Sequence, residues 1–172
     1  MRRLLLLRHA KAVPAEEPLA DVARPLAARG ERDAAWIGER LSRHGLKPDR
    51  IIVSPAARAL RSAEIVASVL GYPREHIGTL HPLYLAEPDA ILDIVAAQDA
   101  RVESLLVVGH NPGLSDLVLE LLPSFEIGDL PTAAVVGLDY PDAAAWAEVG
   151  AATARLAYYD FPKNLAPPVT AR

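Results

Sequence analysis

The sequence of 172 residues contains no cysteine. Disulfide bonds, thiolate metal sites and cysteine nucleophiles are therefore excluded. The absence of disulfides is compatible with the cytoplasm, and we predict a cytoplasmic location. Long apolar runs are missing as well, because no segment approaches the ~20 apolar residues that a membrane-spanning helix needs. We therefore expect no membrane partner.

An excess of positive charge is also absent. The 18 Lys and Arg residues against 22 Asp and Glu residues give a net charge of −4. Nucleic-acid binding proteins usually carry a basic excess, so we expect no nucleic-acid partner. The net charge does not exclude an anionic substrate, because a local cluster of cations determines the electrostatic potential at a binding site.

Common motifs of catalysis and cofactor binding are missing. The five histidines show no HxH, HxxxH or HExxH spacing, so we expect no metal. The chain has no GxxxxGK[ST] loop and no GxGxxG turn, which argues against nucleotide triphosphatases and dinucleotide folds. It also has no G-x-S-x-G elbow, which removes the usual hydrolase serine.

The most informative run that is present is Leu4–Leu7, followed at once by Arg8 and His9. A continuous apolar run is typical of a buried parallel strand, and in open α/β sheets the chemistry lies just past the carboxyl ends of the strands. Arginine binds anions in a fixed fork, and neutral histidine is a nucleophile. The pair indicates a site for phosphoryl transfer.

Two further junctions have the same layout. A short apolar run ends at Ser54, before Pro55 and Arg58, and another ends at Gly109, before His110 and the sequence Asn-Pro. Ser54 and Asn111 are predicted helix N-caps, with proline at the first helical position. Arg58 then lies in the first turn of its helix, and His110 lies where free backbone N–H groups favour an anion.

Periodicity predicts a single α/β domain over 1–165 and a surface tail over 166–172. We expect strands over 3–7, 51–53, 104–108, 133–138 and 152–158, helices over 30–44, 55–70, 88–97 and 112–122, and irregular segments over 10–29 and 72–85. The last two strands have no helix between them, which favours an antiparallel pair. The expected fold is a three-layer α/β/α sandwich with a mixed, mostly parallel central sheet.

Each candidate residue has a structural alternative. His9 as nucleophile competes with a histidine that caps a backbone carbonyl, and the neighbouring Arg8 favours the nucleophile. Arg58 as a phosphate clamp competes with a surface arginine, and His110 as a second site imidazole competes with a hydrogen-bonded core histidine. Arg61, three residues after Arg58 on a similar face, could equally be a solvated charge, and we leave it out of the core site. The remaining histidines are interpreted as surface or loop residues; they are His44, His76 and His81.

In combination, these motifs resemble the histidine phosphatase superfamily, and within it the small phosphohistidine phosphatases of the SixA type. The matching segments are Arg8-His9-Ala10-Lys11-Ala12, Asp21, Arg24-Pro25-Leu26, Ser54-Pro55-Ala56-Ala57-Arg58-Ala59, Gly109-His110-Asn111-Pro112 and Pro131-Thr132. The resemblance implies a phosphoglycerate mutase-like fold and a phosphorylated His9. It also implies that Arg8, Arg58 and His110 surround the phosphoryl oxygens, without metal or organic cofactor. We include Asn111 among the phosphate-binding residues.

The sequence departs from the wider superfamily at two positions. Ala10 stands where glycine is frequent, and Asn111 stands where the acid-phosphatase branch has a proton-donating aspartate. Glu87 and Asp21 are the candidate general acids. Glu87 could instead simply favour the start of its helix, and Asp21 could pair with Arg24.

We therefore expect a phosphatase that acts on a phosphorylated small molecule or a phosphohistidine protein through phospho-His9. A missing acid is least harmful for a phosphoramidate, whose nitrogen can be protonated before attack. The alternatives are a phospho-protein binding module with negligible turnover and a small-molecule phosphomutase. The sequence carries no signal of the oligomeric state.

Overall fold

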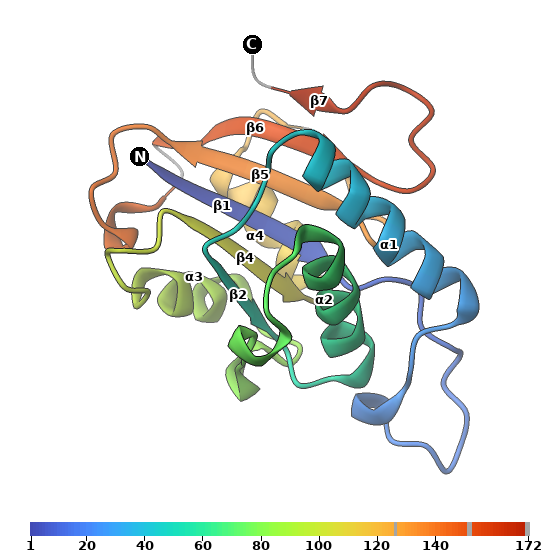
Figure 1. Cartoon of the computed structure of the whole chain (residues 1–172). Helices are drawn as coiled ribbons and strands as arrows, with labels where there is room; N and C mark the ends of the chain where they lie inside the picture. The colour runs from blue at the N-terminus through green and yellow to red at the C-terminus, as the bar shows by residue number, and fades with distance from the viewer. Residues whose placement is uncertain (126, 151–152, 171–172) are drawn as a thin grey trace.

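A computed structural model describes residues 1–125, 127–150 and 153–170. The described residues form one mixed sheet with the strand order β3-β2-β4-β1-β5-β6-β7 (Figure 1). The strands are β1 (Arg2–Arg8), β2 (Arg50–Val53), β3 (Gly78–Thr79), β4 (Ser104–Gly109), β5 (Val135–Tyr140), β6 (Arg155–Asp160) and β7 (Val169–Thr170). The first four strands are mutually parallel, and β5, β6 and β7 each pair antiparallel with the preceding neighbour in the sheet.

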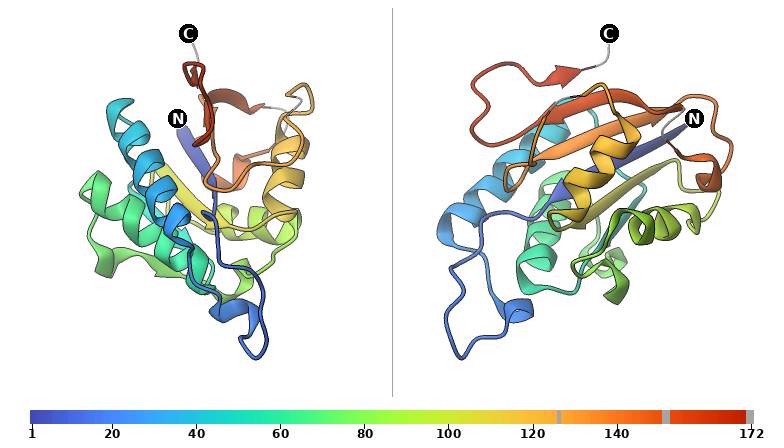
Figure 2. Two further views of the ribbon diagram at one scale, coloured as in Figure 1. Left: turned by 90° about the vertical axis from the view of Figure 1, so that its right-hand side faces the viewer. Right: turned by 180° about the vertical axis from the view of Figure 1, so that it is seen from behind.

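Helices cover both faces of the sheet, which confirms the predicted three layers. Helices α1 and α2 lie on one face, and α3 and α4 lie on the other (Figure 2). Their bounds are α1 (Ala28–Arg43), α2 (Ala57–Leu70), α3 (Pro88–Ala96) and α4 (Gly113–Leu121), with 3-10 turns η1 (Asp21–Ala23), η2 (Arg74–His76), η3 (His81–Leu83) and η4 (Trp146–Glu148). No helix in these described ranges is long and apolar enough to cross a membrane.

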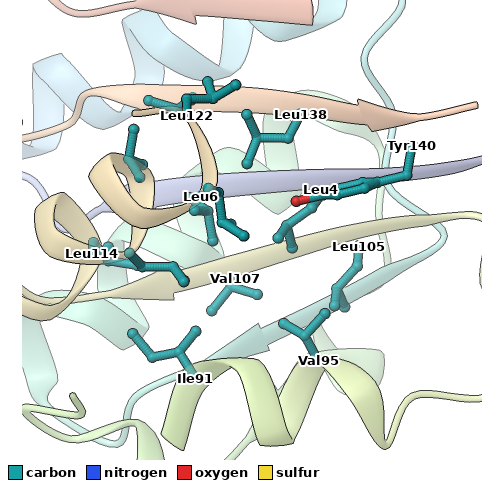
Figure 3. Packing of buried hydrophobic residues seen from close by; sticks show 14 of the residues in the cluster. Leu4, Leu6, Ile91, Val95, Leu105, Val107, Leu114, Leu122, Leu138 and Tyr140 are labelled. Carbon is teal, nitrogen blue, oxygen red and sulfur yellow. The ribbon is translucent and has the colours of Figure 1, made fainter. Parts of the chain in front are cut away.

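The apolar run of β1 supplies both halves of the core. Successive side chains of a strand point to opposite faces. Leu4 and Leu6 accordingly pack against α3 and α4 (Figure 3), whereas Leu5 and Leu7 pack against α1 and α2. All four leucines are buried. A strand buried on both faces has no polar side to alternate with, and this explains the continuous leucine run.

The start of α2 lies two residues later than the prediction. The helix begins at Ala57 with Ala56 as its N-cap, so the predicted cap at Ser54 and first helical position at Pro55 are wrong. The physical reason is the extended backbone of Ala56 (φ −60°, ψ 135°), which delays the first helical turn. The Ser54 hydroxyl lies 2.6 Å from Nε2 of His110. Arg58 still falls in the first helical turn, as predicted.

The start of α4 also differs. Pro112 is the N-cap and Gly113 the first helical residue, so the predicted cap at Asn111 is wrong. Asn111 uses its side-chain Nδ2 to donate to the carbonyl of Leu130 at 3.2 Å instead. Gly113 allows close packing here, because a Cβ atom would lie 1.9 Å from the carbonyl oxygen of Ala86.

The two C-terminal strands of the sequence prediction form an antiparallel pair, but both lie about two residues later than expected. Ala133, the expected first strand residue, instead occupies a turn with φ of +61° and donates its N–H to the Arg8 carbonyl. Residue 152, the expected start of the last strand, lies outside the described residues. Within the predicted tail, Val169–Thr170 pairs with β6, and residues 171–172 are likewise outside the description.

Candidate active site

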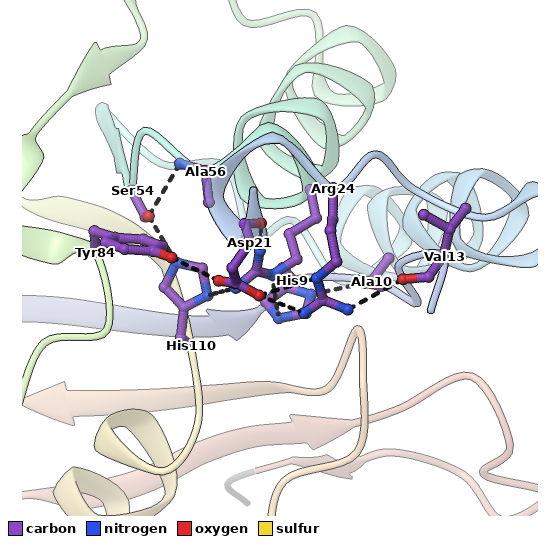
Figure 4. A network of polar contacts seen from close by, with 10 residues as sticks. His9, Ala10, Val13, Asp21, Arg24, Ser54, Ala56, Tyr84 and His110 are labelled. Carbon is purple, nitrogen blue, oxygen red and sulfur yellow. Dashed lines mark hydrogen bonds and ion pairs between the residues drawn. The ribbon is translucent and has the colours of Figure 1, made fainter. Parts of the chain in front are cut away.

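Four predicted site residues lie together at the carboxyl edge of the parallel strands. Arg8 is the last residue of β1, and Arg58 reaches the same place from the first turn of α2. His9 follows β1 and His110 follows β4, and their rings lie close together (Figure 4). The ring centroids of the two histidines are 5.2 Å apart. All four side chains line one cavity of about 370 Å³, together with Asn111.

The ring of His9 is held in one tautomer. Its Nδ1 lies 2.8 Å from the carbonyl oxygen of Ala10, so this nitrogen carries the proton and donates it. Nε2 then accepts a hydrogen bond from Nε of Arg58 at 3.3 Å. Burial, helped by the nearby cations Arg58 and Arg8 and opposed by the hydrogen bond to Ala10, lowers the pKa of His9 to about 4. His9 is therefore neutral near pH 7, with the lone pair of Nε2 in the cavity.

His110 is buried, and both of its ring nitrogens have polar partners. Its Nε2 lies 2.6 Å from Oγ of Ser54, and its Nδ1 lies 3.4 Å from Nη2 of Arg58. Burial lowers the pKa of His110 to about 3, and His9 and Arg58 add to the effect. The Ser54 hydroxyl also accepts the N–H of Ala56 at 3.3 Å.

Asp21 connects the loop before α1 to Arg58. Its carbonyl oxygen accepts Nη1 of Arg58 at 2.7 Å, and its Oδ2 accepts Nη2 at 3.0 Å. The hydroxyl of Tyr84 donates to the same Oδ2 at 2.6 Å, and Nε of Arg24 donates to Oδ1 at 2.9 Å. The hydrogen bond from Tyr84 and the bonds from Arg58 lower the pKa of Asp21 to about 2. Asp21 is thus ionised in this arrangement near pH 7.

The Arg8 side chain has one hydrogen-bond partner among the described residues. Its Nη1 donates to the carbonyl of Leu130 at 2.5 Å. Among the described residues no carboxylate lies within ion-pair distance of it, and its buried Nε has no hydrogen-bond partner. Burial lowers the pKa of Arg8. Arg8 is half-buried, with Asp129 as a more distant opposite charge, and an anion in the cavity would offset the remaining desolvation cost.

The other predicted candidates have different positions. Glu87 is an exposed N-cap of α3 and does not line the cavity, whereas Asp21 does. Arg61 forms an ion pair with Glu31 on the surface, as its interpretation as a solvated charge requires. The three histidines outside the site are exposed; they are His44, His76 and His81. In the described part of the chain, no group of three or more His, Asp or Glu side chains is arranged to hold a metal ion.

Two residues of this network were not predicted as site residues. Ser54 was interpreted as a helix cap, although its place directly after β2 is equivalent to that of His9 after β1, and this equivalence was an available signal. Tyr84 lies in an irregular segment, and no local pattern distinguishes it. Its ring packs edge-on against His110, with centroids 5.6 Å apart.

Comparison with known proteins agrees with the geometry. Residues 4–83 match the family described as histidine phosphatase superfamily (branch 1). An uncharacterized protein of Mycobacterium tuberculosis (strain CDC 1551 / Oshkosh) is 30% identical over 166 residues, which cover 91% of this chain and 100% of that protein.

Solved structures give the same result. A candidate SixA phosphohistidine phosphatase from Nakamurella multipartitia is 31% identical, with a TM-score of 0.75 and coverage of 95% of this chain and 97% of the other. The protein histidine phosphatase SixA complexed with tungstate has a TM-score of 0.79 at 23% identity, with coverage of 95% and 99%, and shows the shared fold. These matches support phosphatase activity, and the chain belongs to the histidine phosphatase superfamily, in its SixA-type branch.

Proposed function

We propose that this protein hydrolyses a phosphomonoester or a protein phosphohistidine through a covalent phosphohistidine on His9. The single observation that carries the proposal is the neutral His9 ring, whose Nε2 lies in a cavity lined by Arg8, Arg58 and a second histidine. A neutral imidazole can attack phosphorus and hold the phosphoryl group, which divides one displacement into two steps.

In the first step, Nε2 of His9 forms a bond to phosphorus while the bond from phosphorus to the leaving oxygen or nitrogen breaks. The leaving atom keeps that electron pair. Arg8, Arg58 and His110 donate hydrogen bonds to the phosphoryl oxygens, where charge lies in the transition state, and Asn111 adds a contact. In the second step, water attacks phosphorus, the N–P bond breaks, and neutral His9 and inorganic phosphate result.

Ser54 has a supporting role in this proposal. A serine hydroxyl both donates and accepts, so at 2.6 Å it can bond Nε2 of His110 in either tautomer. When a phosphoryl group occupies the cavity, Ser54 donates to Nε2. The ring proton of His110 then lies on Nδ1, the nitrogen that faces Arg58 and the cavity.

The leaving group decides how much a general acid matters. Glu87 does not line the cavity, and Asp21 is ionised and bonded to Arg58. An alkoxide leaves poorly without a proton, whereas the nitrogen of a phosphoramidate can be protonated before attack. This chemistry favours phosphohistidine or a phosphomonoester with a good leaving group over an alkyl phosphate.

The test compares His9→Ala with His76→Ala, which removes an exposed histidine of η2. We expect wild type and His76→Ala to hydrolyse para-nitrophenyl phosphate and to form an alkali-stable, acid-labile phosphoenzyme. His9→Ala should do neither. Wild-type rates in His9→Ala would exclude His9 as the nucleophile.

Two further measurements, binding of a phosphohistidine protein and transfer of the phosphoryl group to an added acceptor, separate the two alternative functions. A phospho-protein binding module would bind a phosphohistidine protein without releasing phosphate, and a phosphomutase would return the phosphoryl group to a second acceptor. We also propose a single domain over 1–165 and a cytoplasmic location. Limited proteolysis and cell fractionation test these two proposals.

A further inference from the structure

A second cavity of about 280 Å³ adjoins the site and has a different character. Lys11 and Thr132 line both cavities, so the second one continues the first. Its other charged lining residues are Arg29 and Lys163, and no acidic side chain lines it. Three cations therefore gather in one concave place on a chain whose net charge is −4.

The wall formed by Lys11 and Arg29 is fixed by close backbone packing. The carbonyl of Lys11 accepts the N–H of Ala27, the N-cap of α1, at 2.9 Å. Gly30 permits this approach, because a Cβ atom there would lie 2.1 Å from the same carbonyl oxygen. Arg29 is thereby held next to Lys11 in the first turn of α1, where it also contacts Asp33 at 3.3 Å.

The wall that carries Lys163 is fixed by a buried carboxylate. Asp160 is fully buried at the end of β6, and its Oδ2 accepts Nε of Arg40 in α1 at 2.7 Å. Its Oδ1 accepts the N–H of Phe161 and Nδ2 of Asn164, both at 3.0 Å. The turn of 161–164 is therefore tied beside α1, where the chain leaves β6 (Figure 1).

Lys11 and Lys163 lack acidic partners. Both side chains are exposed, and among the described residues neither forms an ion pair. Exposed lysines usually extend into solvent, but here two of them and Arg29 line a cavity whose walls the core holds in place. Cations arranged in this way raise the local concentration of anions.

We propose that this second cavity is a subsite for another anionic group of the substrate. The proposal rests on the function proposed above and specifies its substrate class: a phosphorylated compound with a carboxylate or a second phosphate beside the scissile group. The phosphoryl group would occupy the cavity with His9, and the second anion would extend past Thr132 toward Lys163 and Arg29. The second anion can belong to a small-molecule substrate or to an acidic residue next to phosphohistidine in a protein substrate, because both present the same negatively charged group.

The test uses matched pairs of substrates. 3-Phosphoglycerate and glycerol 3-phosphate differ by a carboxylate in place of a hydroxymethyl group. A phosphohistidine peptide flanked by aspartates is compared with the same peptide flanked by asparagines. We expect at least one anionic member to have a kcat/KM about fivefold higher than that of its partner, the upper range for solvated charge pairs. The pair that shows the preference identifies the source of the anion.

The variants Lys163→Met and Arg29→Met remove cations that line only the second cavity. In each variant, the ratio of kcat/KM for the anionic substrate to kcat/KM for its partner should fall toward one. Turnover of para-nitrophenyl phosphate should stay unchanged. Lys47→Met is the matched control, because this exposed lysine precedes β2 at the opposite edge of the sheet. The proposal is wrong if neither pair shows a preference, or if Lys47→Met reduces it as much as Lys163→Met.

A binding measurement keeps this proposal separate from the proposed function. Calorimetric titration of the same pairs into His9→Ala needs no turnover. Tighter binding of the anionic member, weakened by adding Lys163→Met, supports the subsite even if wild type hydrolyses nothing. Equal binding of both members overturns the subsite even if His9 proves to be the nucleophile.

Discussion

Asp21 and Arg58 form an ion pair of 3.0 Å at the mouth of the catalytic cavity. Arg58 is almost fully buried, whereas the side chain of Asp21 is 45% exposed. The carboxylate thus approaches from the solvent side and occupies a donor that a phosphoryl oxygen would use. Substrate binding requires Arg58 to exchange one anion for another, or to share its donors between them.

This exchange predicts the effect of Asp21→Asn. Removing the competing charge should tighten inhibition by inorganic phosphate about twofold to fivefold, as expected for a partly solvated pair. The kcat for para-nitrophenyl phosphate should stay close to that of wild type, because its leaving group needs no acid. Inhibition and turnover assays on both proteins check this. A large loss of kcat confined to alkyl phosphates would identify Asp21 as a general acid instead.

The second prediction concerns Ser54. Ser54→Ala removes the hydroxyl that donates to Nε2 of His110 when a phosphoryl group is bound, so the tautomer with its proton on Nδ1 is no longer stabilised. We expect kcat to fall about tenfold, less than the loss of a whole oxyanion donor. Ser54→Thr keeps the hydroxyl and should restore most of the activity. Nitrogen-15 chemical shifts of the His110 ring should change in the alanine variant and not in the threonine variant. Unchanged shifts and rates in Ser54→Ala would show that the hydroxyl only fills space.

The third prediction concerns stability and pH. The folded-state pKa values of about 4 for His9 and about 3 for His110 lie below the ordinary value of 6.5. Between pH 6.5 and 4 the unfolded chain therefore binds protons that the folded chain does not, and stability falls as the pH falls. From pH 7 to pH 5 each buried histidine should cost about 2 kcal/mol. Asp21, with a pKa of about 2, contributes in the same direction only below its ordinary value of 3.8.

Urea unfolding at pH 7 and pH 5 measures this loss. The matched variant carries His9→Gln and His110→Gln, which keep polar side chains but do not titrate. Its free energy of unfolding should depend much less on pH than that of wild type. Equal pH dependence in the two proteins would assign the effect to other groups.

The layered fold was predictable because its signals are local. The leucine run of β1 marks a strand buried on both faces, and the residues that end α1 and α2, Gly45 and Gly71, take the positive φ values that the predicted helix ends required. Element boundaries were less predictable. Ser54 is a good cap by residue type, but the extended backbone of Ala56 moves the helix start two residues on, and the Ser54 hydroxyl contacts His110.

For the site, local sequence patterns placed Arg8, His9, Arg58 and His110 at or just past the carboxyl ends of predicted strands. In a parallel sheet this is enough to bring them to one edge, because parallel strands end on the same side. Which further side chains complete the cavity depends on tertiary contacts. The loop before α1 brings the Asp21 carboxylate to Arg58, and the buried carboxylate of Asp160, the last residue of β6, holds the turn of Lys163 beside α1. Such contacts join segments far apart in the chain, so neither periodicity nor residue type in any one segment encodes them.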